Sequence, residues 1–272
     1  MAFWGCSFIF DDIPCEEFDL MMYDIGSSSN NTGKFATGAT IVEDKVSSRW
    51  KPFFYGTKYE DKLKVQLTFG VNTDRIEKQQ HFTRQEMEEI AFWLTGHREY
   101  KWLSIMQDDM ALIRYHCIVT SLETVEFGLE PYAMKATFEC DGPYAYLPER
   151  DFVYTINNAT NIQVNNISGH RGYFMPVFNM VFSGSGRRSL TIVNHSDGDR
   201  TTQFSDIPSG AASMRIDSDR QIITIENVGS NPYQYMASPF NFPRLVNGIN
   251  DLTVTGNGTL HVICAFPKNV GA

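Results

Sequence analysis

The sequence lacks the motifs on which most enzymes and metal-binding proteins depend. None of the six histidines belongs to an H-x-x-x-H or H-E-x-x-H pattern, and no G-x-S-x-G, phosphate-loop or dinucleotide motif occurs. Asp11-Asp12 and Asp108-Asp109 are adjacent residues whose side chains diverge in a strand, so solvated turns suit them better than acid/base catalysis. Asp197–Asp199 lacks the remaining ligands of a calcium loop. The sequence therefore predicts no catalytic residue, no metal site and no cofactor.

Basic runs, cysteine motifs and long apolar runs are also scarce. The formal charge is −9 and the longest basic run is Arg187-Arg188, which argues against a protein that grips nucleic-acid phosphates. The five cysteines are odd in number and form no C-x-x-C pair, which favours a chain made and kept in a reducing cytoplasm. The first residues have no basic region, and no run approaches the ~18 apolar residues of a membrane helix. We therefore expect neither a signal peptide nor a membrane span.

One segment, residues 83–95, has the pattern of an amphipathic helix. Thr83 at the N-cap and Glu86 three residues later predict a capping box, and Gly96 offers a left-handed stop. Phe82 before the cap and Met87 inside the helix can form a hydrophobic staple. The apolar face recurs at helical spacing through Met87, Ile90, Ala91 and Leu94, with Phe92 and Trp93 at its flanks. We predict that this helix is a structural cover for a sheet.

The rest of the N-terminal half predicts strands. Polar and apolar residues alternate over 62–69 and 132–140, while 102–106 and 112–120 are rich in β-branched and aromatic residues. The helix follows the first of these strands and precedes the others. We therefore expect an α+β domain over residues 1–142, with one helix on an antiparallel sheet.

Residues 141–150, DGPYAYLPER, mark the best domain boundary because two prolines and a glycine directly follow a strand. Beyond them the helix signals vanish and short strands follow: FVYTI, MPVFNMVF, SLTIV, SMRID, QIITIEN, LTVTG and TLHVICAF. Turn residues separate them, as in SDGD (196–199) and TGNGT (255–259), and SMRIDSDRQIITIEN predicts a hairpin about Ser218-Asp219. These features predict a β-sandwich over residues 143–272, and a mainly β chain overall.

Three aromatic residues in a row, Phe53, Phe54 and Tyr55, form a candidate contact surface. In a strand, at least one of them points away from the core, which marks a candidate protein contact. A strand buried on both faces is an equally good interpretation. The preceding SSSNNTG, residues 27–33, predicts a polar loop or hairpin tip.

Four segments carry a family resemblance through their order and spacing: SFIFDDIPCEEFDLMMYDIG, FTRQEMEEIAFWLTGHREYKWL, CDGPYAY and NFPRLVNGINDLTVTGNGTLHVICAFP. With these segments the chain resembles, over essentially its whole length, the distal tail protein (Dit) family of long-tailed bacteriophages with non-contractile tails. In the last segment Pro243, Gly248 and Asn250 precede two final strands, as is usual in the family. These are patterns of fold rather than of chemistry.

The resemblance implies a hexameric ring of N-terminal domains at the far end of the tail tube, with galectin-like C-terminal sandwiches projecting outwards. Such a hub joins the tail tube protein to a tail-associated lysin or tail-tip protein, and receptor-binding proteins attach at its periphery. DNA passes through the ring without specific binding, and no membrane is involved. The implied location is the tail tip of the virion, after synthesis in the host bacterial cytoplasm.

Two other functions remain open. The C-terminal sandwich could recognise cell-wall saccharide through Tyr233 and Tyr235, although all four tryptophans lie in the other domain. A cell-wall hydrolase would need a metal triad or an opposed carboxylate pair, and the motifs supply neither. The sequence therefore favours a structural protein that is not an enzyme.

Overall fold

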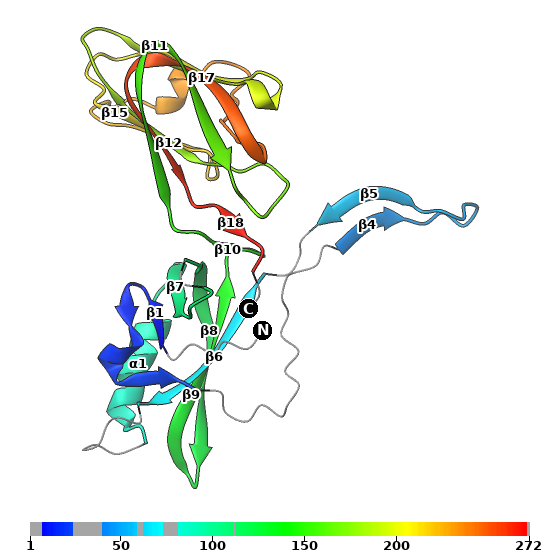
Figure 1. Ribbon diagram of the computed structural model, residues 1–272, viewed down its shortest axis with the longest axis vertical. Helices are drawn as coiled ribbons and strands as arrows, with labels where there is room; N and C mark the ends of the chain where they lie inside the picture. The colour runs from blue at the N-terminus through cyan, green and yellow to red at the C-terminus, as the bar shows by residue number, and fades with distance from the viewer. Residues whose placement is uncertain (1–6, 24–39, 59–61, 73–80, 111, 271–272) are drawn as a thin grey trace. The chain divides into compact units, whose positions relative to one another are not determined.

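The computed structural model describes residues 7–23, 40–58, 62–72, 81–110 and 112–270, and Figure 1 shows their arrangement. The chain is mostly β, as the sequence predicts, and the described residues contain one α-helix. The chain divides into two compact units, the first formed by Met1–Leu147 with Lys268–Ala272 and the second by Pro148–Pro267. No helix in the described part of the chain is long and apolar enough to cross a membrane. The loop predicted at 27–33 lies outside the described residues.

An antiparallel sheet forms the body of the first unit. Its strands run in the order β2-β1-β7-β8-β9-β6-β3, while β10 pairs with β8 and β18 pairs with β10. The bounds are β1 (Ser7–Phe10), β2 (Ile13–Pro14), β3 (Leu20–Met22), β6 (Lys64–Val71), β7 (Lys101–Met106), β8 (Arg114–Phe127), β9 (Glu130–Cys140), β10 (Ala145–Tyr146) and β18 (Pro267–Lys268). The four strands predicted in this half are β6 to β9. The hairpin of β8 and β9 is longer than predicted and turns at Gly128-Leu129.

Alternation of side chains fills the core of this unit with aromatic rings. In β6, Val65, Leu67 and Phe69 are buried and alternate with more exposed residues, as the sequence predicts. The ring of Phe8 in β1 lies 5.4 Å from that of Phe69 and 6.5 Å from that of Phe138 in β9. Because β1 is not adjacent to β6 or β9 in the strand order, these contacts show that the sheet curls around its own core.

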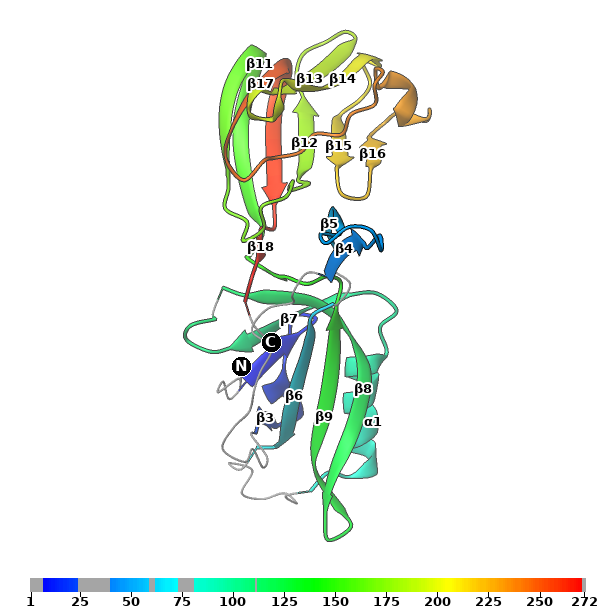
Figure 2. The same cartoon turned by 90° about the vertical axis from the view of Figure 1, so that its right-hand side faces the viewer.

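The helix α1 (Arg84–Thr95) begins with the predicted capping box. Glu86 N donates to Thr83 Oγ1 at 3.3 Å, and Thr83 N donates to Glu86 Oε2 at 2.8 Å. Trp93, which the sequence pattern puts at the flank, is part of the core. Its ring stacks on those of Phe18 at 4.5 Å and Phe8 at 5.7 Å, and its Nε1 donates to a backbone carbonyl oxygen at 3.2 Å. The buried face of the helix is therefore Ile90, Trp93 and Leu94. Figure 2 shows the helix beside β8 of the sheet.

The predicted left-handed stop at Gly96 is wrong. This residue has φ −69° and ψ −9°, which is right-handed backbone open to any amino acid. A Cβ on Gly96 would lie 2.4 Å from the carbonyl oxygen of Phe92. Glycine therefore fits here because the chain approaches the last helical turn closely, not because a left-handed conformation is needed.

A separate two-stranded ribbon consists of β4 (Thr40–Asp44) and β5 (Phe53–Lys58). Its strands pair with each other and with no other strand in the described part of the chain. A bulge interrupts the register after Val42, opposite Gly56, whose φ of +138° favours glycine. The turn at the ribbon's end is closed by a hydrogen bond from Arg49 N to Val46 O at 3.0 Å. We call residues 40–58 the ribbon below.

The second unit is built around one long hairpin-like pair, β11 and β17, which are hydrogen-bonded along their full length. The strand order is β14-β13-β17-β12-β15-β16, with β11 on the other side of β17. The bounds are β11 (Arg150–Asn166), β12 (Val177–Phe182), β13 (Arg188–Asn194), β14 (Arg200–Ile207), β15 (Ser213–Asp217), β16 (Ile222–Ile225) and β17 (Gly248–Cys264). β15 and β16 form the hairpin predicted about residues 218–219.

The β11–β17 pair is shared between two layers. The first half of β17 pairs with β13, and its second half pairs with β12. Side chains of Met180 in β12 and Leu190 in β13 both lie within 4 Å of the point that a Cβ on Gly256 would occupy. Because side chains of β12 and β13 thus meet over β17, the unit has the layered arrangement of a β-sandwich, with its core between the layers.

The turn predicted at TGNGT is wrong, because residues 255–259 lie within the continuous strand β17. Gly258 has φ +146°, and a Cβ there would lie 2.0 Å from the carbonyl oxygen of Val181. The glycines therefore allow a bend and a close approach between strands rather than a reversal of the chain. The strand β14 was not predicted, since its sequence RTTQFSDI has only Phe204 and Ile207 as large apolar residues.

Candidate functional site

The predicted contact residues lie on the ribbon, and all three are exposed. Asp44 pairs with Phe53 and Glu43 with Phe54, and successive residues of a strand point to opposite faces. Both faces of the ribbon therefore carry an aromatic ring. The exposed fractions are 43% for Phe53, 64% for Phe54 and 67% for Tyr55. These values exclude a strand buried on both faces, and the contact role stays a prediction.

The turn of the ribbon carries a tryptophan that the sequence analysis missed. Trp50 is 93% exposed and lies between the exposed residues Arg49 and Lys51. The guanidinium Cζ of Arg49 lies 4.0 Å from the centroid of the Phe53 ring, which is a cation–π distance. A lone tryptophan between two charged residues has no periodicity that would reveal it, and the neighbouring Ser47-Ser48 and Pro52 indicate only a turn. Trp, Tyr and Arg are the residues most enriched at binding hot spots.

The ribbon differs in charge from the chain that carries it. Its basic residues are Lys45, Arg49, Lys51 and Lys58, and its acidic residues are Glu43 and Asp44. Four positive and two negative side chains give the ribbon a charge of +2, whereas the whole chain carries −9. The ribbon is therefore a basic, aromatic surface on an acidic protein, which favours an acidic partner.

A second exposed apolar surface lies beside α1 of the first unit. It is a groove of about 650 Å³, lined by Ile13, Phe18, Gln85, Glu88, Glu89, Phe92, Trp93 and His97. Phe92 is 80% exposed, and Glu88 and Glu89 on the same side of the helix are also exposed. The groove thus combines an apolar lining with two carboxylates at its edge. We call it the α1 groove below.

The two tyrosines predicted for saccharide contact come together on one short 3-10 helix, Pro232–Tyr235. Tyr233 is partly exposed, and its hydroxyl donates to Gln221 O at 2.8 Å. The hydroxyl of Tyr235 lies 2.7 Å from that of Ser230. Both hydroxyl groups therefore have partners inside the unit, where they position the segment between β16 and β17. A saccharide role for either ring remains a prediction.

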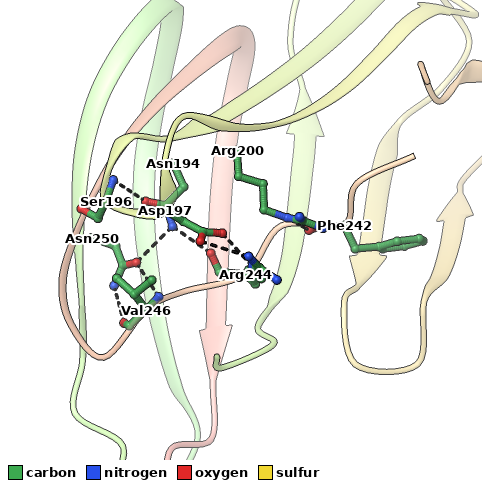
Figure 3. Close-up of polar contacts among 8 residues, drawn as sticks. All are labelled: Asn194, Ser196, Asp197, Arg200, Phe242, Arg244, Val246 and Asn250. Carbon is green, nitrogen blue, oxygen red and sulfur yellow. Dashed lines mark hydrogen bonds and ion pairs between the residues drawn. The ribbon is translucent and has the colours of Figure 1, made fainter. Parts of the chain in front are cut away.

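A polar network anchors the segment that leads into β17 (Figure 3). Arg244 donates to both carboxylate oxygens of Asp197, from Nε at 2.7 Å and from a terminal nitrogen at 3.1 Å. These hydrogen bonds raise the pKa of the Arg244 guanidinium, which also lies 3.4 Å from the Tyr173 ring centroid. Arg200 Nε donates to Phe242 O at 3.1 Å. The carboxylate of Asp197 therefore serves an internal ion pair rather than a calcium site.

Asn250 lies at the centre of this network and is fully buried. Its Oδ1 accepts from Val246 N at 2.8 Å and from Asn194 Nδ2 at 3.1 Å, while its Nδ2 donates to Val246 O at 2.9 Å and to Gly248 O at 3.0 Å. Gly248 itself has φ +91°. Gly248 and Asn250, which the sequence pattern puts before the final strands, are thus the first and third residues of β17, where they fix the entry of the chain by backbone conformation and hydrogen bonds.

The acidic pairs occupy turns, as the sequence predicts. Asp11 and Asp12 both have positive φ, at 52° and 61°, and connect β1 to β2 as in a type I′ hairpin. Asp108 and Asp109 lie in the turn after β7. Within the described ranges, no group of three or more His, Cys, Asp or Glu side chains is placed to hold a metal ion.

Two family models match the chain in succession. The first, described as a phage tail protein N-terminal domain, matches residues 4–142, and the second, a phage tail C-terminal domain, matches residues 144–264. The chain belongs to this family of phage tail proteins. The match makes this phage tail protein a structural component of the virion, and it agrees with the likeness to the distal tail protein family seen in the sequence. A search of curated proteins found no match.

The fold of this phage tail protein is similar to that of a phage hub protein and of a phage baseplate chain of known structure. The Dit protein (gp 19.1) of phage SPP1, described as a paradigm of the hub adsorption apparatus in Gram-positive infecting phages, has a TM-score of 0.68 at 14% identity, covering 96% of this chain and 98% of the other. A chain of the phage P2 baseplate in its activated conformation with Ca has a TM-score of 0.54 at 10% identity, covering 97% and 98%. The similarity therefore includes both units.

Proposed function

We propose that this phage tail protein is the hub of a tail tip, where its N-terminal units form a hexameric ring that continues the DNA channel of the tail tube. The ring joins the tail tube protein on one face to a tail-tip protein or tail-associated lysin on the other. Receptor-binding proteins attach at its periphery. DNA passes through without specific binding, which suits the charge of −9 because an acidic channel repels the phosphate backbone.

The likeness to the SPP1 Dit protein supports this function because it covers both units and almost the full length of each chain. The fold alone does not determine a function. The observation that carries the proposal is therefore the ribbon, which has hydrophobic side chains on both faces and no strand partner among the described residues. A two-stranded ribbon with no core of its own is marginal in water, so a neighbouring surface is needed to hold it.

A ring supplies such a surface at every subunit. In a closed ring each subunit gives one contact and receives one, so a patch of modest affinity gains from repetition. We propose that Phe54, with Phe53 and Tyr55, belongs to this contact. The work of the protein is then mechanical and non-enzymatic, in the virion and after synthesis in the host cytoplasm.

Electron microscopy of the purified protein in negative stain, with mass photometry of the same sample, tests the ring directly. We expect rings of about six subunits around a central hole. Phe54→Glu should abolish them, because it places a charge in the contact, whereas Val153→Glu, at an exposed position of the second unit, should not. Intact rings of Phe54→Glu would show that this residue does not belong to the contact. Monomers of the unmodified chain would contradict the ring and make the saccharide-binding function the next to test, on a glycan array with the full chain.

A further inference from the structure

The first unit presents two exposed surfaces of complementary chemistry. One is the turn of the ribbon, where the 93% exposed Trp50 lies between two basic side chains. The other is the α1 groove, whose apolar lining has two exposed carboxylates at its edge. An aromatic ring between two positive charges matches an apolar groove beside two negative charges in polarity and in sign of charge.

The helical spacing of the groove residues makes this match specific. Glu88 and Phe92 are separated by four residues and Glu89 and Phe92 by three, so both carboxylates lie next to the exposed ring on one side of the helix. Beneath them, the stacked rings of Phe18 and Trp93 form an apolar wall. A guest that buries an aromatic ring there brings its flanking residues within reach of the glutamates.

The ribbon supplies such a guest within three consecutive residues. Arg49 and Lys51 flank Trp50, and no described residue of the ribbon lines the α1 groove of its own chain. Aromatic side chains bury a large area at a low cost in side-chain entropy, and Trp is among the most common hot-spot residues. The flanking charges add attraction at a distance and fix the direction of entry.

We propose that the turn of the ribbon of one copy docks in the α1 groove of the next copy, with Trp50 in the groove and Arg49 and Lys51 beside Glu88 and Glu89. This inference rests on the proposed ring and names both surfaces of its subunit contact. The contact is heterologous, because two different surfaces of the same chain meet. Contacts of this kind close into rings when the rotation between subunits allows it.

Exchange of charges between two variants tests the pairing. In the ribbon variant, Arg49→Glu is combined with Lys51→Glu; in the groove variant, Glu88→Lys is combined with Glu89→Lys. All four positions are exposed, so circular dichroism and the melting temperature should match those of the unmodified chain. Mass photometry and sedimentation velocity then measure assembly of each variant alone and of an equimolar mixture.

Each variant alone should be monomeric, because like charges then meet at every contact. The mixture should form rings again if the two variants alternate. The acidic ribbon of the ribbon variant then meets the basic groove of the groove variant at one contact, and the native ribbon meets the native groove at the next. A chain with all four substitutions should also assemble. Trp50→Ala should weaken assembly by at least about 30-fold, the loss typical of a hot spot. A control with Asp219→Lys and Glu226→Lys in the second unit makes an equal charge change and should still assemble.

The outcomes separate this inference from the proposed hub. Rings formed by the groove variant alone would overturn the inference and leave the ring standing. A mixture that stays monomeric while the fourfold variant assembles would show a contact within one chain, and would also overturn it. Monomers of the unmodified chain at every concentration would reject both the ring and the contact.

Discussion

Replacement of Asn250 by alanine tests whether the polar network of Figure 3 holds the entry to β17 in place. The amide makes four hydrogen bonds of 2.8 to 3.1 Å, to Val246 N, Val246 O, Gly248 O and Asn194 Nδ2, inside a fully buried site. Alanine removes all four and leaves the groups that they satisfied without this partner. Because Val246 lies just before β17 and Gly248 is the first residue of this strand, which forms the longest strand pair of the second unit, the damage falls on that unit.

The expected loss is about 2–4 kcal/mol, since each hydrogen bond contributes roughly 0.5–1.5 kcal/mol and an unsatisfied buried group costs roughly 1–3 kcal/mol. At a typical urea dependence of about 2 kcal/mol per M, the unfolding midpoint of the second unit falls by about 1–2 M. All four tryptophans lie in the first unit, so tryptophan fluorescence follows that unit, whereas far-UV circular dichroism follows both. The dichroism transition should shift while the fluorescence transition stays in place.

Ile249→Ala is the matched control, because this neighbouring side chain is exposed on the opposite face of β17 and should change stability by less than about 0.5 kcal/mol. A dichroism midpoint that shifts no more in Asn250→Ala than in the control would show that the network does not stabilise the second unit. A fluorescence midpoint that falls by the same amount would show that the network does not act within the second unit alone.

Three further outcomes follow from the packing. Trp93→Ala should destabilise the first unit by about 3–5 kcal/mol, measured by urea unfolding, because it empties a core position and removes a buried hydrogen bond. Gly258→Ala should cost about 2 kcal/mol or more, whereas Gly229→Ala, where a Cβ meets open space, should cost little; equal melting temperatures would contradict this. Burial raises the pKa of the Cys140 and Cys264 thiols to about 12, above the ordinary 9.0. They therefore contribute stability below pH 9 that is lost as the pH rises toward 12, and at pH 8 they should react with a thiol reagent only after unfolding.

The start of the helix could be predicted from the sequence because its determinants are local. Thr83 and Glu86 satisfy each other's backbone groups within one turn, whatever the rest of the chain does. Its end and its buried face depend on contacts that are distant in sequence. Trp93 joins the core because Phe8 and Phe18 lie beside it, and Gly96 is needed because of a close approach rather than its conformation.

In the second unit, the structure of a glycine-rich segment also depends on contacts that are distant in sequence. TGNGT has the composition of a turn, yet its residues form ladder pairs with β11 along the whole segment. Glycine is required at position 258 because a Cβ there would collide with a carbonyl oxygen of β12. No local sequence pattern shows this close approach. Polar strands are missed for the opposite reason. In β14 the residue Thr202 takes a buried position that alternation of large apolar residues would not reveal.

The candidate contact could be predicted only in part. Phe53, Phe54 and Tyr55 attract notice as a run of aromatics, but their exposure depends on whether another strand or layer covers them. Trp50 and the α1 groove were missed, because one is a single residue and the other joins residues 13–18 to residues 85–97 in space. Such a surface is exposed because no other strand or layer covers it, and a local sequence pattern does not record which parts of the fold are covered.

Helix α1, the one α-helix among the described residues, has two faces that differ in exposure. Ile90, Trp93 and Leu94 close the core, and a cover for the sheet requires no more than that face. The opposite side nevertheless exposes 80% of Phe92 beside two glutamates, so the gain from burying this ring, about 2 kcal/mol, is not realised in the isolated chain. In the proposed ring of identical subunits, each contact would bury this ring once. The free-energy gain is small for one pair of subunits but adds up around the closed assembly. In the proposed ring, the helix therefore serves both as a cover for its own sheet and as a contact for the next subunit.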